Sequence, residues 1–177
     1  MKSLICFLLL FAIEAQAMKF KVRAREHFDS HKIDINGAET TYKGLSNTIN
    51  LWWEMPYELY YGFYFNPVFA SAEEEDAGSA LGEEVDYFHV GVEAKYFVHK
   101  IVQNVYVRPG LGYSILKPDN SVDDAKGYNV YLGLGYEYPF EKFGLALEAA
   151  IRYADLSDDV TVTSFTPSIG FHFYEMF

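Results

Sequence analysis

Hydrophobic and polar residues alternate one by one along the C-terminal segment of the chain, residues 160–177. Counting by twos places large apolar side chains on one face, namely Phe165, Ile169, Phe171, Phe173 and Phe177. The opposite face carries smaller or more polar side chains, among them Thr166, Ser168, Gly170 and His172. A period of two predicts a β-strand with two different faces.

The same alternation recurs along the rest of the chain. Eight such segments can be counted, at residues 19–28, 42–55, 58–70, 84–98, 104–116, 127–139, 143–154 and 160–177. The connections at 56–57, 99–103 and 140–142 are short, whereas those at 29–41, 71–83, 117–126 and 155–159 are mostly longer and more polar. Short and long connections in turn are typical of barrels that cross a membrane. We therefore predict an all-β fold, an eight-stranded antiparallel up-and-down transmembrane β-barrel.

The N-terminus has the pattern of a secretory signal peptide. A short basic start containing Lys2 precedes an apolar run at residues 4–13, and Ala15-Gln16-Ala17 is a small-x-small cleavage site. This run is too short to span a bilayer. We expect residues 1–17 to be a cleavable signal and residues 18–177 to be the barrel. Cys6, the only cysteine, lies within the signal, so the mature chain has no disulfide.

Composition supports a barrel in lipid. Aromatic residues make up 18% of the chain, with 15 Tyr and 15 Phe, more than a soluble β-domain of this length would ordinarily expose. A lipid-facing wall needs such side chains, and we expect an interfacial aromatic girdle near the short turns, from Trp53, Tyr61, Tyr96, Tyr136, Tyr138, Phe143 and Phe177. The net charge of −11 argues against nucleic acid as a partner, because phosphate binding needs a basic surface.

The terminal aromatic strand and the strand pattern resemble those of bacterial outer-membrane β-barrel proteins of the OmpA/OmpX-like eight-stranded superfamily. The resemblance covers residues 18–177 and lies in architecture and strand pattern. It implies a bacterial outer-membrane location after export, with contacts to membrane lipid and lipopolysaccharide, and a monomer. In this family the last strand is part of the signal read by the barrel-assembly machinery, a role that the resemblance gives to Phe171, Phe173 and Phe177.

Charged residues fall on the faces expected to point into the lumen. They are Arg23, Arg25, Glu54, Glu93, Lys95, Arg108, Glu137, Glu148 and Arg152. Buried charges persist when they are paired, so we expect an ion-pair network that fills the lumen. The alternative is a narrow ion path gated by switchable pairs. Eight strands leave little room for a pore, which favours the filled lumen.

Catalysis is not expected from the histidines. Lipid A deacylase barrels, which share this size, use a His and a Ser two residues apart on one face. Here the residue two positions after His89 is Gly91, and the residue two positions after His172 is Tyr174, so the His and Ser spacing is absent. We therefore interpret each lumen histidine as a hydrogen-bonding filler and expect no enzyme and no cofactor.

Three prolines lie inside predicted strands, Pro67, Pro109 and Pro167. Proline cannot donate to a strand ladder, so each position marks a bulge or a gap. The favoured interpretation is a local bulge that sets curvature. The alternative is a lateral gate for lipid, as the palmitoyltransferase barrels imply by resemblance.

Acidic residues gather in the long connections. The set comprises Glu73, Glu74, Glu75, Asp76, Asp123, Asp124, Asp158 and Asp159. We interpret them as a solvated rim at one end of the barrel; the alternative is weak Ca²⁺ or Mg²⁺ binding that bridges to lipopolysaccharide. The sequence thus favours a structural or surface-interaction protein over a small-solute channel, and over a lipid A-modifying enzyme.

Overall fold

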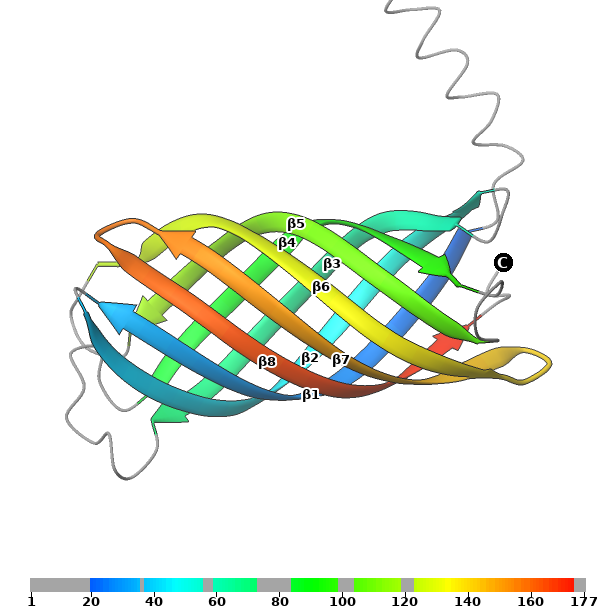
Figure 1. The fold of residues 1–177 in the computed structure, drawn as a ribbon, viewed down its shortest axis with the longest axis horizontal. Helices are drawn as coiled ribbons and strands as arrows, with labels where there is room; N and C mark the ends of the chain where they lie inside the picture. The colour runs from blue at the N-terminus through cyan, green and yellow to red at the C-terminus, as the bar shows by residue number, and fades with distance from the viewer. Residues whose placement is uncertain are drawn as a thin grey trace, which may run out of the picture.

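The protein is a closed barrel of eight strands. The computed structural model describes residues 20–35, 37–55, 59–72, 84–98, 104–118 and 123–173. The strands are β1 (Phe20–Ile35), β2 (Ala38–Met55), β3 (Leu59–Ala72), β4 (Glu84–Phe97), β5 (Val105–Pro118), β6 (Ala125–Pro139), β7 (Phe143–Leu156) and β8 (Val160–Phe173). They follow one another in sequence order, all pairs are antiparallel, and β8 closes against β1 (Figure 1). The predicted fold class is confirmed.

No helix among the described residues is long and apolar enough to cross a membrane.

Side chains alternate between the wall and the lumen along every strand. In β6 the exposed Val130, Leu132 and Leu134 alternate with the buried Tyr131 and Glu137. Large apolar side chains are therefore exposed all around the outer wall, where hydrocarbon can solvate them. The polar side chains between them turn inward, where they can satisfy one another.

The first hairpin differs from the sequence-based prediction. Residues 29–41 were expected to form a long connection, but β1 runs to Ile35 and β2 begins at Ala38. Gly37 lies in the turn with φ of 88°, a conformation that glycine adopts without strain, and its N–H donates to Asp34 Oδ1 at 2.8 Å. The prediction was wrong because this stretch lacks an apolar outward face. Its outward residues, Ser30 and Lys32, are polar.

The three in-strand prolines interrupt pairing without shifting its register. Pro67 pairs with β4 but not with β2, where Ser46↔Val68 and Ile49↔Phe65 continue in the same register on both sides. Pro109 and Pro167 likewise pair on one side only, leaving gaps toward β4 and β1. The expected bulges are therefore absent at these positions. A missing N–H has removed a hydrogen bond without adding a residue.

The outer end of the barrel has an apolar interior. We use "outer end" for the end that carries the β1–β2 and β7–β8 turns. Every strand contributes inward, buried apolar side chains there, which we call the outer cluster: Ile33, Tyr42, Val68, Ala70, Val85, Tyr87, Leu116, Ala125, Ala154, Leu156, Val160 and Val162. The strands thus continue beyond the apolar wall with their faces exchanged, apolar inside and polar outside.

Candidate functional site: the barrel lumen and its outer end

Glu148 on β7 is the centre of the charged lumen contacts. Its Oε1 accepts from Arg25 Nη1 at 2.6 Å, and Arg108 donates to both carboxylate oxygens, through Nε to Oε2 at 2.9 Å and through Nη2. Tyr106 Oη donates to Oε2 at 2.8 Å. All four side chains are buried. A buried carboxylate surrounded by guanidinium and phenol donors has the satisfied hydrogen bonds that such a charge requires.

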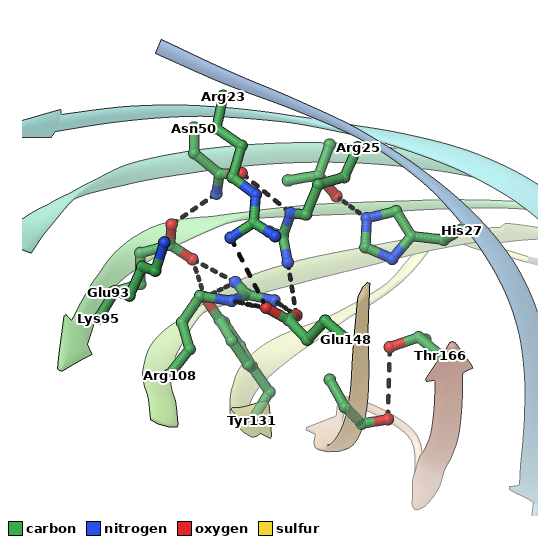
Figure 2. A network of polar contacts seen from close by, with 12 residues as sticks. Arg23, Arg25, His27, Asn50, Glu93, Lys95, Arg108, Tyr131, Glu148 and Thr166 are labelled. Atoms are coloured by element: carbon green, nitrogen blue, oxygen red, sulfur yellow. Dashed lines mark hydrogen bonds and ion pairs between the residues drawn. The ribbon is translucent and has the colours of Figure 1, made fainter. Parts of the chain in front are cut away.

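Glu93 on β4 is the second acceptor of this network, and Arg108 joins the two carboxylates. Arg108 Nη1 lies 2.5 Å from Glu93 Oε2, and Figure 2 shows Arg108 reaching both Glu93 and Glu148. Trp52 and Tyr131 also donate to Glu93, as does Asn50 at 2.5 Å. We call this set the lumen network: Arg23, Arg25, Asn50, Trp52, Glu93, Tyr106, Arg108, Tyr131 and Glu148.

Arg23 is stabilised mainly by aromatic rings. Its Nη2 donates to Tyr106 Oη at 2.7 Å, while its nearest carboxylate oxygen, on Glu148, is 3.8 Å away. The guanidinium carbon lies 5.5 Å from the Trp52 ring and 5.3 Å from the Tyr106 ring. Cation–π attraction therefore supplements a weak ion pair at this fully buried charge.

A separate ionic group lies toward the chain termini. Lys95 Nζ bonds Glu137 Oε2, and His172 Nδ1 lies 3.1 Å from Glu137 Oε1. The ammonium also lies 4.3 Å from the Tyr106 ring and 4.4 Å from the Phe97 ring. The predicted lumen charges thus fall into two groups that share the aromatic side chains between them.

Two predicted lumen charges lie outside these ion pairs. Arg152 Nη1 donates to Asn66 Oδ1 at 2.9 Å, and its guanidinium lies over the rings of Tyr64 and Tyr131. Glu54 is half-buried one residue from the end of β2, where it is the register partner of Tyr60.

Further polar side chains pair across strands in the lumen between the lumen network and the outer cluster. His31 Nδ1 lies 2.7 Å from Ser164 Oγ, His89 Nδ1 lies 2.8 Å from Ser114 Oγ, and His27 Nε2 lies 2.7 Å from Thr48 Oγ1. Sequence reasoning missed these pairs, because their partners come from different strands and only the register brings them together. Both serines are at most 1% exposed, so neither hydroxyl is accessible to a substrate.

The described part of the acidic rim is exposed. Asp123 and Asp124 precede β6, and Asp124 lies 3.5 Å from Lys126 Nζ. Asp158 and Asp159 form the β7–β8 turn with φ of 61° and 56°. Glu73, Glu74, Glu75 and Asp76 lie outside the described residues. Within the described ranges no three His, Cys, Asp or Glu residues are grouped so that they could hold a metal ion.

The apolar wall carries two grooves at proline gaps. One, of about 680 Å³, lies at Pro167 between Phe28, Leu147 and Ile169. The other, of about 470 Å³, lies at Pro109. Of the predicted assembly residues, Phe171 and Phe173 are exposed on this wall at the end of β8, whereas Phe177 lies outside the described residues, as do residues 1–17 with the predicted cleavage site.

Comparison with known proteins places this barrel in a family. A family model described as outer membrane protein beta-barrel domain matches residues 3–173. Neisserial surface protein A is similar in structure, with a TM-score of 0.61 and 18% identity over 89% of this chain and 97% of that one. Ail, the attachment invasion locus protein of Yersinia pestis, was solved with the heparin analogue sucrose octasulfate; its TM-score is 0.62, with 15% identity over 88% of this chain and 100% of that one.

No curated protein matches the chain significantly. Identities this low show the fold alone, but the family model spans nearly the whole sequence. Together with the closed eight-stranded barrel and its apolar wall, the match indicates a bacterial outer-membrane location. The chain belongs to the outer membrane protein beta-barrel domain family.

Proposed function

We propose that the protein is a non-conducting outer-membrane barrel that serves as a rigid anchor and presents its outer end to partners at the cell surface. The observation that carries the proposal is the outer cluster. Buried apolar side chains from all eight strands meet across the outer end of the lumen. An ion crossing there would have to leave water for an apolar interior, which is strongly unfavourable.

The lumen network gives a second obstacle to conduction. Its carboxylates are fully engaged by arginine, tyrosine, tryptophan and asparagine donors, and its side chains are buried. Breaking such a pair to open a path would leave a charge unpaired in the barrel interior, at a cost of about 3–5 kcal/mol. These contacts favour a structural role for the lumen charges over a switchable gate.

Conductance in planar bilayers tests the closed lumen. The purified barrel should show no discrete channel steps. A variant with Tyr42, Tyr87 and Leu116 changed to Ala, which removes large side chains from the outer cluster, is the matched comparison. Regular single-channel steps from the unmodified protein would overturn the proposal and favour the small-solute channel.

The charge of the chain narrows the kind of surface partner. Ail was crystallised with a polyanionic sugar, but this chain carries a net charge of −11 and acidic turns at its outer end. Like charges repel, so we propose that the outer end contacts basic or cation-bridged surfaces and not heparin-like ones. Divalent cations held loosely by the acidic turns would provide such a bridge to lipopolysaccharide.

Vesicle retention on coated beads tests this charge preference. Vesicles that contain the protein should bind polylysine-coated beads more than empty vesicles do, and should gain nothing on heparin-coated beads. The control variant changes Asp123, Asp124, Asp158 and Asp159 to Asn, which tolerates the positive φ of the β7–β8 turn. Retention on heparin, or no gain on polylysine, would contradict the proposed preference.

The last strand supports a proposal on assembly. Phe171 and Phe173 are exposed on the apolar wall at the end of β8, the strand that must close against β1. We expect deletion of Phe177 to lower the amount of inserted, heat-modifiable barrel far more than it lowers synthesis. Normal insertion of that variant would remove the assembly role from the terminal residue.

A further inference from the structure

Two polar side chains point outward within the apolar wall, Glu26 on β1 and Asn47 on β2. They are register partners, and both are exposed. The side chains around them, along the same strands and across to β8, are exposed and apolar: Ala24, Phe28, Leu45, Ile49 and Ile169. We call Glu26 and Asn47 the polar seam.

The polar seam has no partner within the part of the barrel that the structure describes. Neither Glu26 nor Asn47 makes a side-chain hydrogen bond or ion pair there. Hydrocarbon offers no hydrogen bonds, so polar groups at such a position are costly unless another polar group pairs with them.

The backbone at the polar seam is also incompletely paired. Pro67 leaves a gap opposite Asn47, because pairing of β2 with β3 stops after Ser46↔Val68 and resumes at Ile49↔Phe65. The lumen side chain of Asn66 donates to the Asn47 carbonyl at 3.3 Å. The barrel thus satisfies the backbone of Asn47 from inside, while its side-chain amide on the lipid side keeps free donors and an acceptor.

A second copy of the chain offers the complementary groups. Two copies inserted in the same direction are related by a twofold axis along the membrane normal, which gives a self-complementary contact. Such a rotation places β1 of each copy opposite β2 of the other. Because Glu26 and Asn47 are register partners, each Glu26 then meets the Asn47 of the other copy.

We propose that the polar seam is the contact between two copies of this barrel lying side by side in the membrane. The Asn47 amide of each copy donates to the Glu26 carboxyl group of the other, so the contact forms twice. Polar side chains of this kind hold membrane-embedded surfaces together where hydrophobic burial gives no driving force. The arrangement replaces the monomer expected from the sequence.

Disulfide cross-linking between two differently tagged full-length copies tests the dimer. In a Cys6→Ser background, one copy carries Ala24→Cys and the other Ile49→Cys, positions that are register partners beside the polar seam. After folding into phospholipid vesicles and oxidation, a mixed disulfide dimer is expected. The matched control replaces Ala24→Cys by Leu132→Cys, an exposed wall position on β6, and should not cross-link.

Substitutions in the polar seam test its chemistry. Glu26→Leu or Asn47→Leu in both copies should weaken association about tenfold, whereas Glu26→Gln, which keeps hydrogen-bonding atoms, should retain it. Heat-modifiable migration verifies that each variant is folded. The proposal is overturned if no mixed dimer forms, if the β6 control cross-links equally, or if the leucine variants associate like the unmodified chain.

Discussion

The two halves of this barrel place their apolar side chains on opposite faces of the strands. In the membrane half, β5 exposes Leu111 to the wall and buries Arg108 inside; in the outer half, the same strand buries Leu116 and exposes Lys117. The period of two continues unbroken along the strand, but the apolar face changes from outward to inward. The face that is apolar therefore reports the solvent around each half, hydrocarbon in one and water in the other.

The two halves are also stabilised by different interactions. The apolar wall of the membrane half gains little free energy from contact with other protein side chains, because the lipid around it is equally apolar. The interior of this half depends instead on paired charges and hydrogen bonds. The outer half resembles a soluble β-barrel, in which water drives apolar side chains into the interior. Substitutions in the two halves should therefore respond to different physical causes.

The largest effect is expected from the lumen network. Replacing Glu148 by Leu removes the carboxylate that pairs with Arg25 and one of the two that pair with Arg108, and we expect the free energy of unfolding to fall by about 3–5 kcal/mol. Urea unfolding of the barrel in phospholipid vesicles, followed by tryptophan fluorescence, measures this change.

A double-mutant cycle sharpens that test. The variant with both Arg108→Leu and Glu148→Leu should lose less than the sum of the two single losses, because the contact between Arg108 and Glu148 is counted in both single losses but is lost only once. Strictly additive losses would mean that the pair does not interact in the membrane-embedded barrel.

An intermediate effect is expected at two leucines on β5. Leu116 is fully buried in the outer cluster, and Leu116→Ala should cost about 2–5 kcal/mol through lost burial and the cavity that remains. Leu111 is 61% exposed on the wall, and Leu111→Ala should cost about 1 kcal/mol, because lipid fills the vacated space. The same urea titration compares them, and equal losses would remove the distinction between the two halves.

The smallest effect is expected at the exposed ion pair of the first hairpin. Lys32 Nζ lies 2.8 Å from Glu39 Oε1, and this hydrogen bond raises the pKa of Lys32 above its usual value of 10.5. A raised lysine pKa stabilises the folded state below the unfolded-state pKa, and that contribution disappears as pH rises through the folded-state pKa.

The unfolding midpoints of the unmodified barrel and of Lys32→Ala should therefore differ by a small, constant amount between pH 5 and about 9. At pH 5 and above, the difference should narrow only above the usual lysine pKa. A difference that changes between pH 5 and 7 would show that another group titrates with the pair.

Strand pattern was predictable from sequence because period-two alternation is a local property. The eight strands follow from it, and so do the inward faces on which Arg23, Arg108 and Glu148 lie buried. The outer cluster was not recognised, because residues such as Tyr42 and Val160 occur near strand ends, where the apolar face reverses. The signal in the sequence is the point along each strand at which the apolar positions move from the outward face to the inward face.

Contacts between side chains on different strands could not be predicted from the local alternation of the sequence. His31–Ser164 and His89–Ser114 depend on register, which sequence alternation leaves open by steps of two residues. The prolines are similar: a missing N–H predicts interrupted pairing, but only the register across Pro67 distinguishes a gap from a bulge. Glu26 and Asn47 likewise become neighbours only when β1 and β2 are aligned.

The length of the strands determines how far the turns of the outer end lie above the membrane. They contain 14 to 18 residues, whereas a tilted strand needs only about 9–11 to cross the hydrocarbon. A surplus of about four residues, at roughly 3.4 Å each and a tilt of about 40°, raises the turns by about 10 Å. The apolar interior of this extension stiffens it, so a short, rigid section of barrel holds the hairpin tips above the membrane surface. A large partner can approach them from the side without pressing against the lipid headgroups.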